Sequence, residues 1–231
     1  MRPDLSRRLF RWLQQGCGSP FGSCTARLWL PWYNEQAARP SSEKDFYQLM
    51  QAVLETTHLL LRPWQEEDLD PLVRLLAKPE VARFIRLDGR TFTREETAQV
   101  HRRVLESWNE QGLGPWAAID KATGSWIGKL GLMYQVDWPG PDKFEVDYEL
   151  DPACWGRGLA TEGTRAALRY GFVEHALPRI SGATVPEHVA SRKVMEKCGL
   201  TYQGELQFRN ARIVWYALDA STWRQLSLEQ K

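Results

Sequence analysis

The residues that say most about chemistry in this chain lie between Tyr148 and Gly163. A strand pattern ends at Leu150, a short loop of small residues follows, and a helical pattern begins at about Gly158–Ala160. The first turn of a helix has four backbone N–H groups without intrahelical partners and the positive end of the helix dipole. Because the glycines of this loop keep the backbone bare, the turn predicts a phosphate or pyrophosphate site. Arg157 could add a charge or a bidentate contact to the bound anion. The alternative for the whole stretch is an ordinary glycine-rich turn between a strand and a helix.

Two common phosphate-binding loops do not fit this stretch. A dinucleotide fingerprint needs G-x-G-x-x-G, but Thr161 stands where the third glycine should be, and several strands precede the motif. A P-loop needs Gly-Lys-Ser/Thr, but Gly163 is followed by Thr164 and Arg165. The sequence therefore excludes both.

The elements that must position this turn form a mixed α/β pattern. Period-2 and apolar runs predict strands at 58–63, 116–120, 126–134, 144–150, 180–185, 201–208 and 212–218. Helical spacing predicts helices at 65–78, 93–111, 160–175 and 189–198, with a closing helical turn from Ala220. Thr93 and Glu96 form a capping box, Gly112 ends that helix, and Arg209-Asn210 forms the last turn between strands. This order predicts a mixed sheet with helices on its faces.

Composition excludes several classes of protein. Among 231 residues, 30 Lys and Arg stand against 29 Asp and Glu, so the formal net charge of +1 gives no bulk attraction to nucleic acid or anionic lipid. The sequence contains no run of about 18 apolar residues, so nothing in it predicts a membrane-spanning helix. The 4 cysteines show neither a Cys-x-x-Cys pair nor histidines at metal-ligand spacing, which argues against a metal site and a disulfide framework. We therefore expect a cytosolic protein without a metal.

Residues 1–53 differ from the patterned domain expected over 54–231. Leu5–Leu13 has apolar residues on one helical face and arginines mainly on another, and a loop-like stretch follows. Three interpretations remain open for this extension. It is a targeting or membrane-surface helix, an accessory element packed on the main domain, or a segment upstream of a true start at Met50.

Several separated segments together resemble one family. Glu145–Leu150 and Trp155–Glu162 resemble the acetyl-CoA-binding core of the GCN5-related N-acetyltransferases, the GNAT superfamily. Leu59–Pro63, Ser191–Leu200 and Val214–Leu218 match further segments of the family in the same order. The resemblance covers about residues 54–226, and it is greatest to the branch that includes the ribosomal-protein N-terminal acetyltransferases.

The resemblance implies the GNAT fold, in which two neighbouring parallel strands, here 144–150 and 180–185, splay apart beside helices on both faces of the sheet. The pantetheine arm of acetyl-CoA, the acyl donor, would pair with the freed edge at Tyr148–Leu150, and its pyrophosphate would lie on the N–H groups of Trp155–Thr161. A backbone N–H near Tyr148–Leu150 would stabilise the oxyanion. The implied cofactor-binding residues are Tyr148, Glu149, Leu150, Trp155, Gly156, Arg157, Gly158, Leu159, Ala160, Thr161, His188 and Ser191.

The implied catalytic residues are Glu145 and Ser191. An amine is mostly protonated at neutral pH, so a base must accept its proton, and Glu145 matches the acid that often begins this strand in the family. Glu145, Asp147 and Glu149 share one strand face by alternation, so the alternative is an acidic face that attracts a cationic substrate or meets solvent. Met195 replaces the tyrosine that protonates the leaving thiolate in some relatives, which leaves that role to Ser191, to water or to no group.

Other departures bear on the site. His188 stands where the family commonly has an asparagine, and it either replaces that residue or lies at the helix cap or surface. Asp147 stands where a glycine is common, which changes the acceptor slot. Cys154 and Cys198 are interpreted as small packing residues. Trp116, Trp126 and Trp138 either line the acceptor pocket or belong to the core.

The expected function is acetyl-CoA-dependent N-acetyl transfer to a primary amine, by direct attack in a ternary complex. The acceptor would be a protein N-terminus or a small molecule, with no nucleic acid, and a homodimer is possible. The alternative is a non-catalytic CoA-binding sensor or scaffold module.

Overall fold

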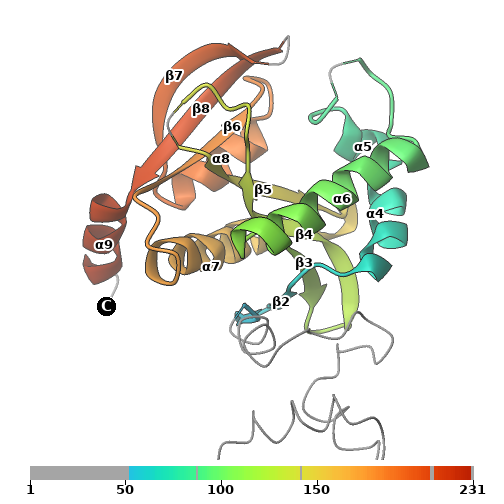
Figure 1. Ribbon diagram of the computed structural model, residues 1–231, viewed down its shortest axis with the longest axis horizontal. Coiled ribbons are helices and arrows are strands. Elements are labelled where there is room, and N and C mark those ends of the chain that lie inside the picture. The colour runs from blue at the N-terminus through green and yellow to red at the C-terminus, as the bar shows by residue number, and fades with distance from the viewer. Residues whose placement is uncertain (1–51, 87, 141, 209–210, 230–231) are drawn as a thin grey trace, which may run out of the picture. The chain divides into compact units, whose positions relative to one another are not determined.

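The computed structural model describes residues 52–86, 88–140, 142–208 and 211–229. Eight strands form one sheet in the order β1-β2-β3-β4-β5-β6-β8-β7 (Figure 1). All neighbouring pairs are antiparallel except β5 and β6, which are parallel. The strands are β1 Leu54–Glu55, β2 Leu59–Arg62, β3 Pro115–Asp120, β4 Ser125–Tyr134, β5 Phe144–Leu150, β6 Arg179–Thr184, β7 Thr201–Phe208 and β8 Ala211–Asp219.

The helices agree closely with those predicted. They are α4 Leu69–Leu76, α5 Pro79–Ala82, α6 Arg94–Gln111, α7 Leu159–Val173, α8 Val189–Lys197 and α9 Ala220–Glu229, with 3₁₀ turns at Glu66–Asp68 and Pro152–Cys154. The capping box is confirmed, because Thr93 N donates to Glu96 Oε2 at 2.8 Å and Glu96 N donates to Thr93 Oγ1 at 3.2 Å. Gly112 ends α6 with a φ of 64°, as a C-terminal glycine does. The mixed α/β fold is therefore confirmed.

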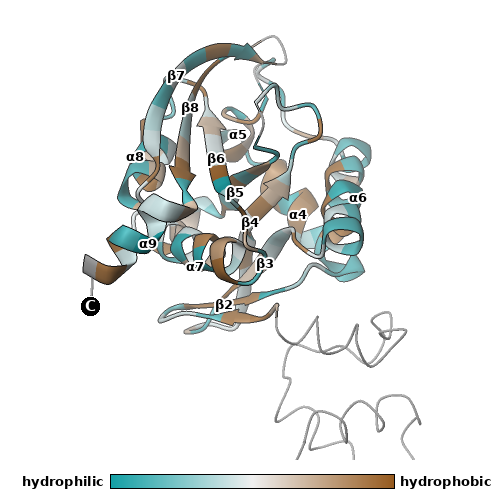
Figure 2. Cartoon of the chain, turned by 60° about the vertical axis from the view of Figure 1, so that its left-hand side comes forward, coloured by the Kyte–Doolittle hydropathy of each residue, from teal (hydrophilic) through white to brown (hydrophobic). Residues whose placement is uncertain are grey.

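Helices cover both faces of β4, and alternation along the strand shows which side chains face which helices. Leu130 faces α7, because a Cβ placed on Gly163 would lie 2.2 Å from Leu130 Cδ1. Lys129 is the next residue and faces the other side, where its cross-strand partner Ala117 lies in the core with residues of α4 and α6. Figure 2 shows hydrophilic residues along the outer side of α6, which suits a helix with one face toward solvent.

The core beneath α4 and α6 contains a buried ion pair. Arg62 donates two hydrogen bonds to Asp68, Nη1 to Oδ2 at 2.7 Å and Nη2 to Oδ1 at 2.6 Å, and the Asp68 side chain is only 2% exposed. The backbone N–H of Gln65 donates to the same carboxylate at 2.8 Å. This pair ties the end of β2 to the start of α4.

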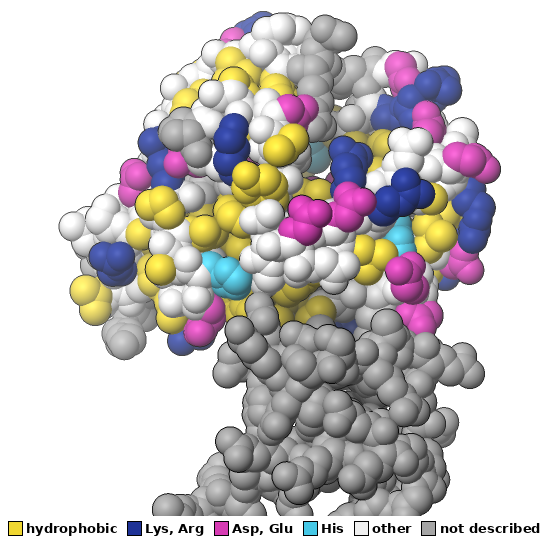
Figure 3. All heavy atoms as spheres, viewed as in Figure 1, with side chains coloured by type: hydrophobic (Ala, Val, Ile, Leu, Met, Phe, Trp, Pro, Cys, Tyr) yellow, Lys and Arg dark blue, Asp and Glu magenta, His cyan; other side chains and the backbone are white. Residues whose placement is uncertain are grey.

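Some expectations differ from the structure or fall outside it. The closing helical turn is the full helix α9, and the short strand β1 was not predicted. The Arg209-Asn210 turn, the Leu5–Leu13 helix and nearly all of the 1–53 extension lie outside the described residues, so the division at residue 53 stays a prediction. Within the described segments, no helix has both the length and the apolar character required to cross a bilayer. The face seen in Figure 3 carries charges of both signs, interspersed. The cytosolic setting stays a prediction.

Candidate active site

The strands β5 and β6 are paired at one end and apart at the other. β5 is paired with β4 along its whole length, from Phe144 to Leu150, but only Glu145 and Ser181 are partners between β5 and β6. Gly182 lies where the strands begin to part, and a Cβ there would lie 2.6 Å from Val146 Cγ2 and 2.7 Å from Met195 Sδ. The predicted splay of the two strands is therefore confirmed.

The open edge of β5 presents backbone groups from alternate residues only. The carbonyl oxygen of Glu149 lies against Gly128 on β4, where a Cβ would be 2.1 Å from it. By alternation, the N–H and C=O groups of Val146 and Tyr148 point into the wedge between β5 and β6. The carbonyl of Leu150 accepts a hydrogen bond from Trp155 Nε1 at 2.8 Å. Glu149 was predicted as part of this edge, but it brings only its side chain to the cleft.

The turn from β5 to α7 leaves the first backbone N–H groups of the helix open. Gly156 has a φ of 76° and Gly158 a φ of 81°, a region that favours glycine, and a Cβ on either would meet nothing within 4 Å. Gly158 is the N-cap of α7 and supplies no side-chain cap. The N–H groups of the first turn therefore stay available to an anion.

Arg157 is placed differently from the expectation. Its Nη1 donates to Asp120 Oδ2 at 2.7 Å, and the Asp120 side chain is 2% exposed. This hydrogen bond, followed by one from the Ala122 N–H, lowers the pKa of Asp120. Arg157 is also absent from the lining of the cleft. Arg157 therefore connects the turn to the end of β3 through an ion pair.

Glu145, Asp147 and Glu149 form an acidic row on one face of β5. A buried lysine, which the sequence analysis did not predict for the site, contacts two of these acids. Lys129 Nζ forms an ion pair with Asp147 and another with Glu149 Oε2 at 2.5 Å, and its side chain is 5% exposed. Burial raises the pKa of Glu149 to about 7, as does the charge of Asp147, against the opposing effect of Lys129. Burial works to lower the pKa of Lys129, but the two carboxylates together raise it above its ordinary value. Glu145 accepts a hydrogen bond from Gln135. A lone lysine within the apolar run Ile127–Leu132 was the available signal.

Tyr148 links β5 to α8 on the opposite face of the strand. Its hydroxyl donates to the carbonyl of Ser191 at 3.0 Å and shares a second hydrogen bond of 2.9 Å with Ser191 Oγ. Burial raises the pKa of Tyr148, so the phenol is neutral at pH 7. The sequence predicted a backbone role for Tyr148 and did not predict this contact.

His188 is half-buried, and its side chain does not cap α8. The ring stacks on Phe84, with centroids 3.7 Å apart and planes 4° from parallel, and Nδ1 lies 3.3 Å from Thr184 Oγ1. Burial, and then the nearby charge of Arg83, lowers the pKa of His188 to about 4. The imidazole is therefore neutral at pH 7.

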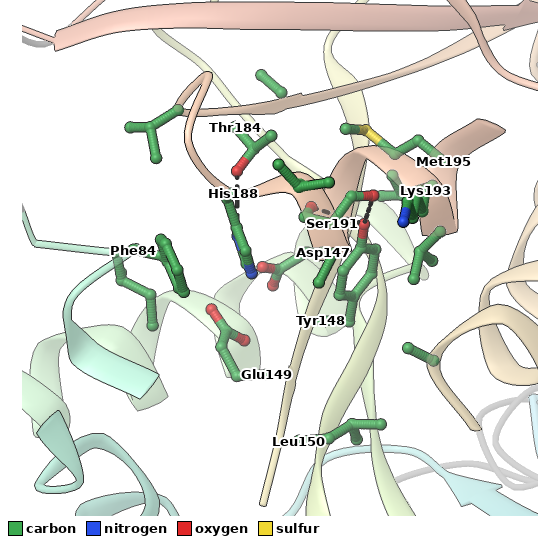
Figure 4. Close-up of a pocket in the computed structure, with 18 of the residues that line it drawn as sticks. Phe84, Asp147, Tyr148, Glu149, Leu150, Thr184, His188, Ser191, Lys193 and Met195 are labelled. Carbon is green, nitrogen blue, oxygen red and sulfur yellow. Dashed lines mark hydrogen bonds between the residues drawn. The ribbon is translucent and has the colours of Figure 1, made fainter. Parts of the chain in front are cut away.

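The edge and the acids of β5, the glycines of the turn, and His188 and Ser191 line one cleft of about 1040 Å³. Figure 4 shows Asp147, Glu149 and His188 projecting into it, with Tyr148 hydrogen-bonded to Ser191. Of the predicted site residues, all except Arg157 belong to its lining. Among the tryptophans in question, Trp138 lines the cleft, Trp116 is fully buried and Trp126 packs on the core. Cys154 and Cys198 are free and buried, as expected for packing residues.

Parted strands, an open helix N-terminus and an acidic wall thus form one cleft that offers an anion site at the helix and carboxylates on one side. The sequence model of the Acetyltransferase (GNAT) domain matches residues 58–201, more than half of the chain. The chain is also 34% identical over 158 residues to the FsC-acetyl coenzyme A-N(2)-transacetylase of Aspergillus fumigatus, with 66% of each chain covered. It thus spans about two thirds of that relative's length. The chain belongs to the GNAT family, whose members use acetyl-CoA, and it is an acyltransferase.

Solved structures show the same fold. A ribosomal-protein alanine acetyltransferase from Vibrio fischeri has a TM-score of 0.60 at 19% identity, covering 74% of this chain and 98% of its own. An aminoglycoside acetyltransferase in complex with coenzyme A has a TM-score of 0.62 at 18% identity, covering 73% of this chain and 99% of its own. At these identities the likeness shows the fold alone.

Proposed function

We propose that the protein transfers an acetyl group from acetyl-CoA to a primary amine by direct attack within one ternary complex. The observation that carries this proposal is the parting of β5 from β6 directly beside the open first turn of α7. The edge groups of Val146 and Tyr148 would hold the pantetheine arm, and the N–H groups from Trp155 to Thr161 would hold the pyrophosphate. Gly156 and Gly158 permit that approach.

The residues around the reacting atoms have separate tasks in this proposal. The N–H groups at the open edge would stabilise the oxyanion that forms when the amine attacks the thioester. The hydroxyl of Ser191, held by Tyr148, would lie near the departing thiolate. The acidic row on the other face of β5 would receive the amine.

The acceptor is proposed to be a small-molecule amine or a protein N-terminus. The Aspergillus fumigatus relative is named as an N(2)-transacetylase that uses FsC and acetyl coenzyme A, and the Vibrio fischeri neighbour as an acetyltransferase of a ribosomal-protein alanine. The similarity to the ribosomal-protein branch stays part of the proposal. A homodimer stays a prediction.

A two-part experiment tests the proposal. Acetyl-CoA is expected to raise the Tm of the full chain, because a ligand that binds only the folded state stabilises it. Release of free CoA is then measured over a panel of primary amines. Absence of a Tm shift would refute the proposed function, and binding without turnover on any amine would favour the sensor or scaffold alternative.

A further inference from the structure

We propose that Glu149 accepts the proton of the acceptor ammonium, and that Lys129 and Asp147 are positioning residues that set its ionisation. The inference rests on the proposed function and names a residue and a substrate class for it. It differs from the expectation for Glu145, which came from the family motif.

The cluster is buried, and its charges do not cancel. The side chains of Lys129, Asp147 and Glu149 are 5%, 19% and 13% exposed. Two carboxylates share one ammonium, so the fully ionised cluster carries one surplus negative charge in a place with little water. A buried charge without a partner is unfavourable. The surplus is relieved either by a proton or by a cation that enters the cleft.

The position along β5 favours Glu149 over Glu145. Glu145 lies at the closed end, where it is the partner of Ser181, and it accepts a hydrogen bond from Gln135. Glu149 lies beyond the point where the strands part, next to Tyr148, whose backbone faces the wedge. A thioester on that edge would be flanked by the carboxylates of Asp147 and Glu149.

Other titratable and charged groups line the same cleft. α5 and the residue after it contribute Glu80 and Arg83, the residues that lead into α8 contribute Glu187 and the neutral His188, and α8 contributes Lys193 and Lys197. Lys193 and Lys197 lie on the helix that Tyr148 contacts, on the other face of β5 from the acidic row. Lys129 is the cation in contact with the row itself. Burial and Asp147 raise the pKa of Glu149 to about 7, which suits a group that must take up a proton near neutral pH.

The ammonium R–NH₃⁺ binds beside the surplus carboxylate and transfers one proton to Glu149, which leaves R–NH₂. The nitrogen lone pair forms the C–N bond at the thioester carbonyl, and the C–S bond breaks. The second proton leaves the nitrogen and goes to the CoA thiolate, and Glu149 later returns its proton to water. The substrate class is therefore an amine that arrives as a cation.

The first test needs no acceptor. Carbon-13 NMR of protein labelled at the Glu carboxyl carbon is expected to show one resonance that titrates near pH 7 and disappears in Glu149→Gln. Its midpoint should move to lower pH in Asp147→Asn, because a neighbouring negative charge is lost. It should move to higher pH in Lys129→Met, because a neighbouring positive charge is lost. If Lys129→Met does not fold, Asp147→Asn carries the test alone.

The second test uses an amine that turns over in the panel above. Glu149→Gln should lower kcat at pH 7 by about 100-fold or more, the usual range for loss of a general base. Glu205→Gln makes the same chemical change at an exposed residue of β7 and should leave kcat unchanged. The acidic limb of the kcat profile should shift in Asp147→Asn in the same direction as the NMR midpoint.

Some outcomes would overturn the inference. They are the absence of any Glu carboxyl titrating between about pH 6 and 8, or a kcat in Glu149→Gln within threefold of wild type. A larger loss of kcat in Glu145→Gln than in Glu149→Gln would assign the role to Glu145 and also overturn it. In these cases the proposed function stands, because acetyl-CoA binding and wild-type turnover are measured separately. A wild-type protein that binds no acetyl-CoA would overturn both.

Discussion

Gly158 is the position where the binding of the acyl donor can be tested with two matched substitutions. The residue has a φ of 81° and opens α7, and a Cβ there would meet nothing within 4 Å. Gly158→Ala adds only a methyl group in open space and a left-handed backbone penalty. Gly158→Asp adds the same penalty and a negative charge at the proposed pyrophosphate site.

A left-handed L-residue costs about 1–2 kcal/mol, so Gly158→Ala should lower the Tm of the free protein by about 2–8 °C for a domain of this size. At a ligand concentration of about 100 Kd the stabilisation is about 2.7 kcal/mol, a Tm rise of about 5–11 °C. One phosphate charge about 5 Å from the new carboxylate, at an effective dielectric of about 20, is repelled by about 3 kcal/mol, or more than 100-fold in Kd. At the same ligand concentration the rise should then fall to about 1 °C or less.

The assay is a thermal scan with and without acetyl-CoA for wild type, Gly158→Ala and Gly158→Asp. Gly158→Ala should keep most of the rise from its lowered starting Tm, and Gly158→Asp should lose it. The free Gly158→Asp protein should be destabilised no more than Gly158→Ala, because Asp tolerates a left-handed backbone at least as well as Ala. A full Tm rise in Gly158→Asp would refute the idea that the anion lies on this turn. Loss of the Tm rise in a folded Gly158→Ala protein would refute the idea that a methyl group at this position leaves the ligand site open.

Three further predictions concern the rest of the domain. Asp68→Ala leaves the buried guanidinium of Arg62 without its ion-pair partner, and it should lower the stability by about 3–5 kcal/mol, or the Tm by about 6–20 °C. Asp70→Ala, at an exposed ion pair, should change the Tm little. Similar Tm values for the two variants would contradict this prediction. His188 has a lowered pKa in the folded protein, so its contribution to stability is present above about pH 6.5 and is lost as the pH falls toward about 4. The fall of Tm between these pH values should be shallower in His188→Gln. Equal slopes in the two proteins would contradict the idea that burial of His188 lowers its pKa. A diamine should have a KM about tenfold or more below that of an aminocarboxylate of equal length, because the acidic row attracts a second ammonium and repels a carboxylate. Equal KM values would show that the acidic row does not contribute to acceptor binding.

Local signals predicted most of the fold. The strand Phe144–Leu150 and the Thr93 capping box follow from period-2 alternation and from cap chemistry, which depend only on neighbours in sequence. The extent of α9 was underestimated because a contact far along the chain supports it. The ring of Trp223 in α9 lies 5.3 Å from that of Phe172 in α7.

The backbone geometry of the candidate site and the acids on β5 were predicted, but the side-chain partners of its charged residues were missed. Glycines at a strand-to-helix turn indicate an open helix N-terminus, so the loop from Trp155 to Thr161 could be read from the sequence. The partners of Arg157 and Glu149 could not, because Asp120 and Lys129 lie far from them in the sequence. The register of β4 against β5 places Lys129 opposite Glu149, and the path of the turn before α7 brings Arg157 to Asp120.

The register also gives β5 separate surfaces, as the proposed ternary complex requires. Its alternating geometry gives three separate surfaces: an open edge at Val146 and Tyr148, an α7-side face that carries the Tyr148 phenol, and an opposite face that carries the acids. If the edge holds the acyl carrier, the amine can reach the thioester from the acidic face without displacing the carrier. Lys129 keeps that face only partly neutralised, since it offers one charge to two carboxylates. Replacing Lys129 with an apolar residue would leave two adjacent buried carboxylates, which disfavour joint ionisation. A single lysine in the neighbouring strand thus decides whether the acidic face can receive a proton at neutral pH.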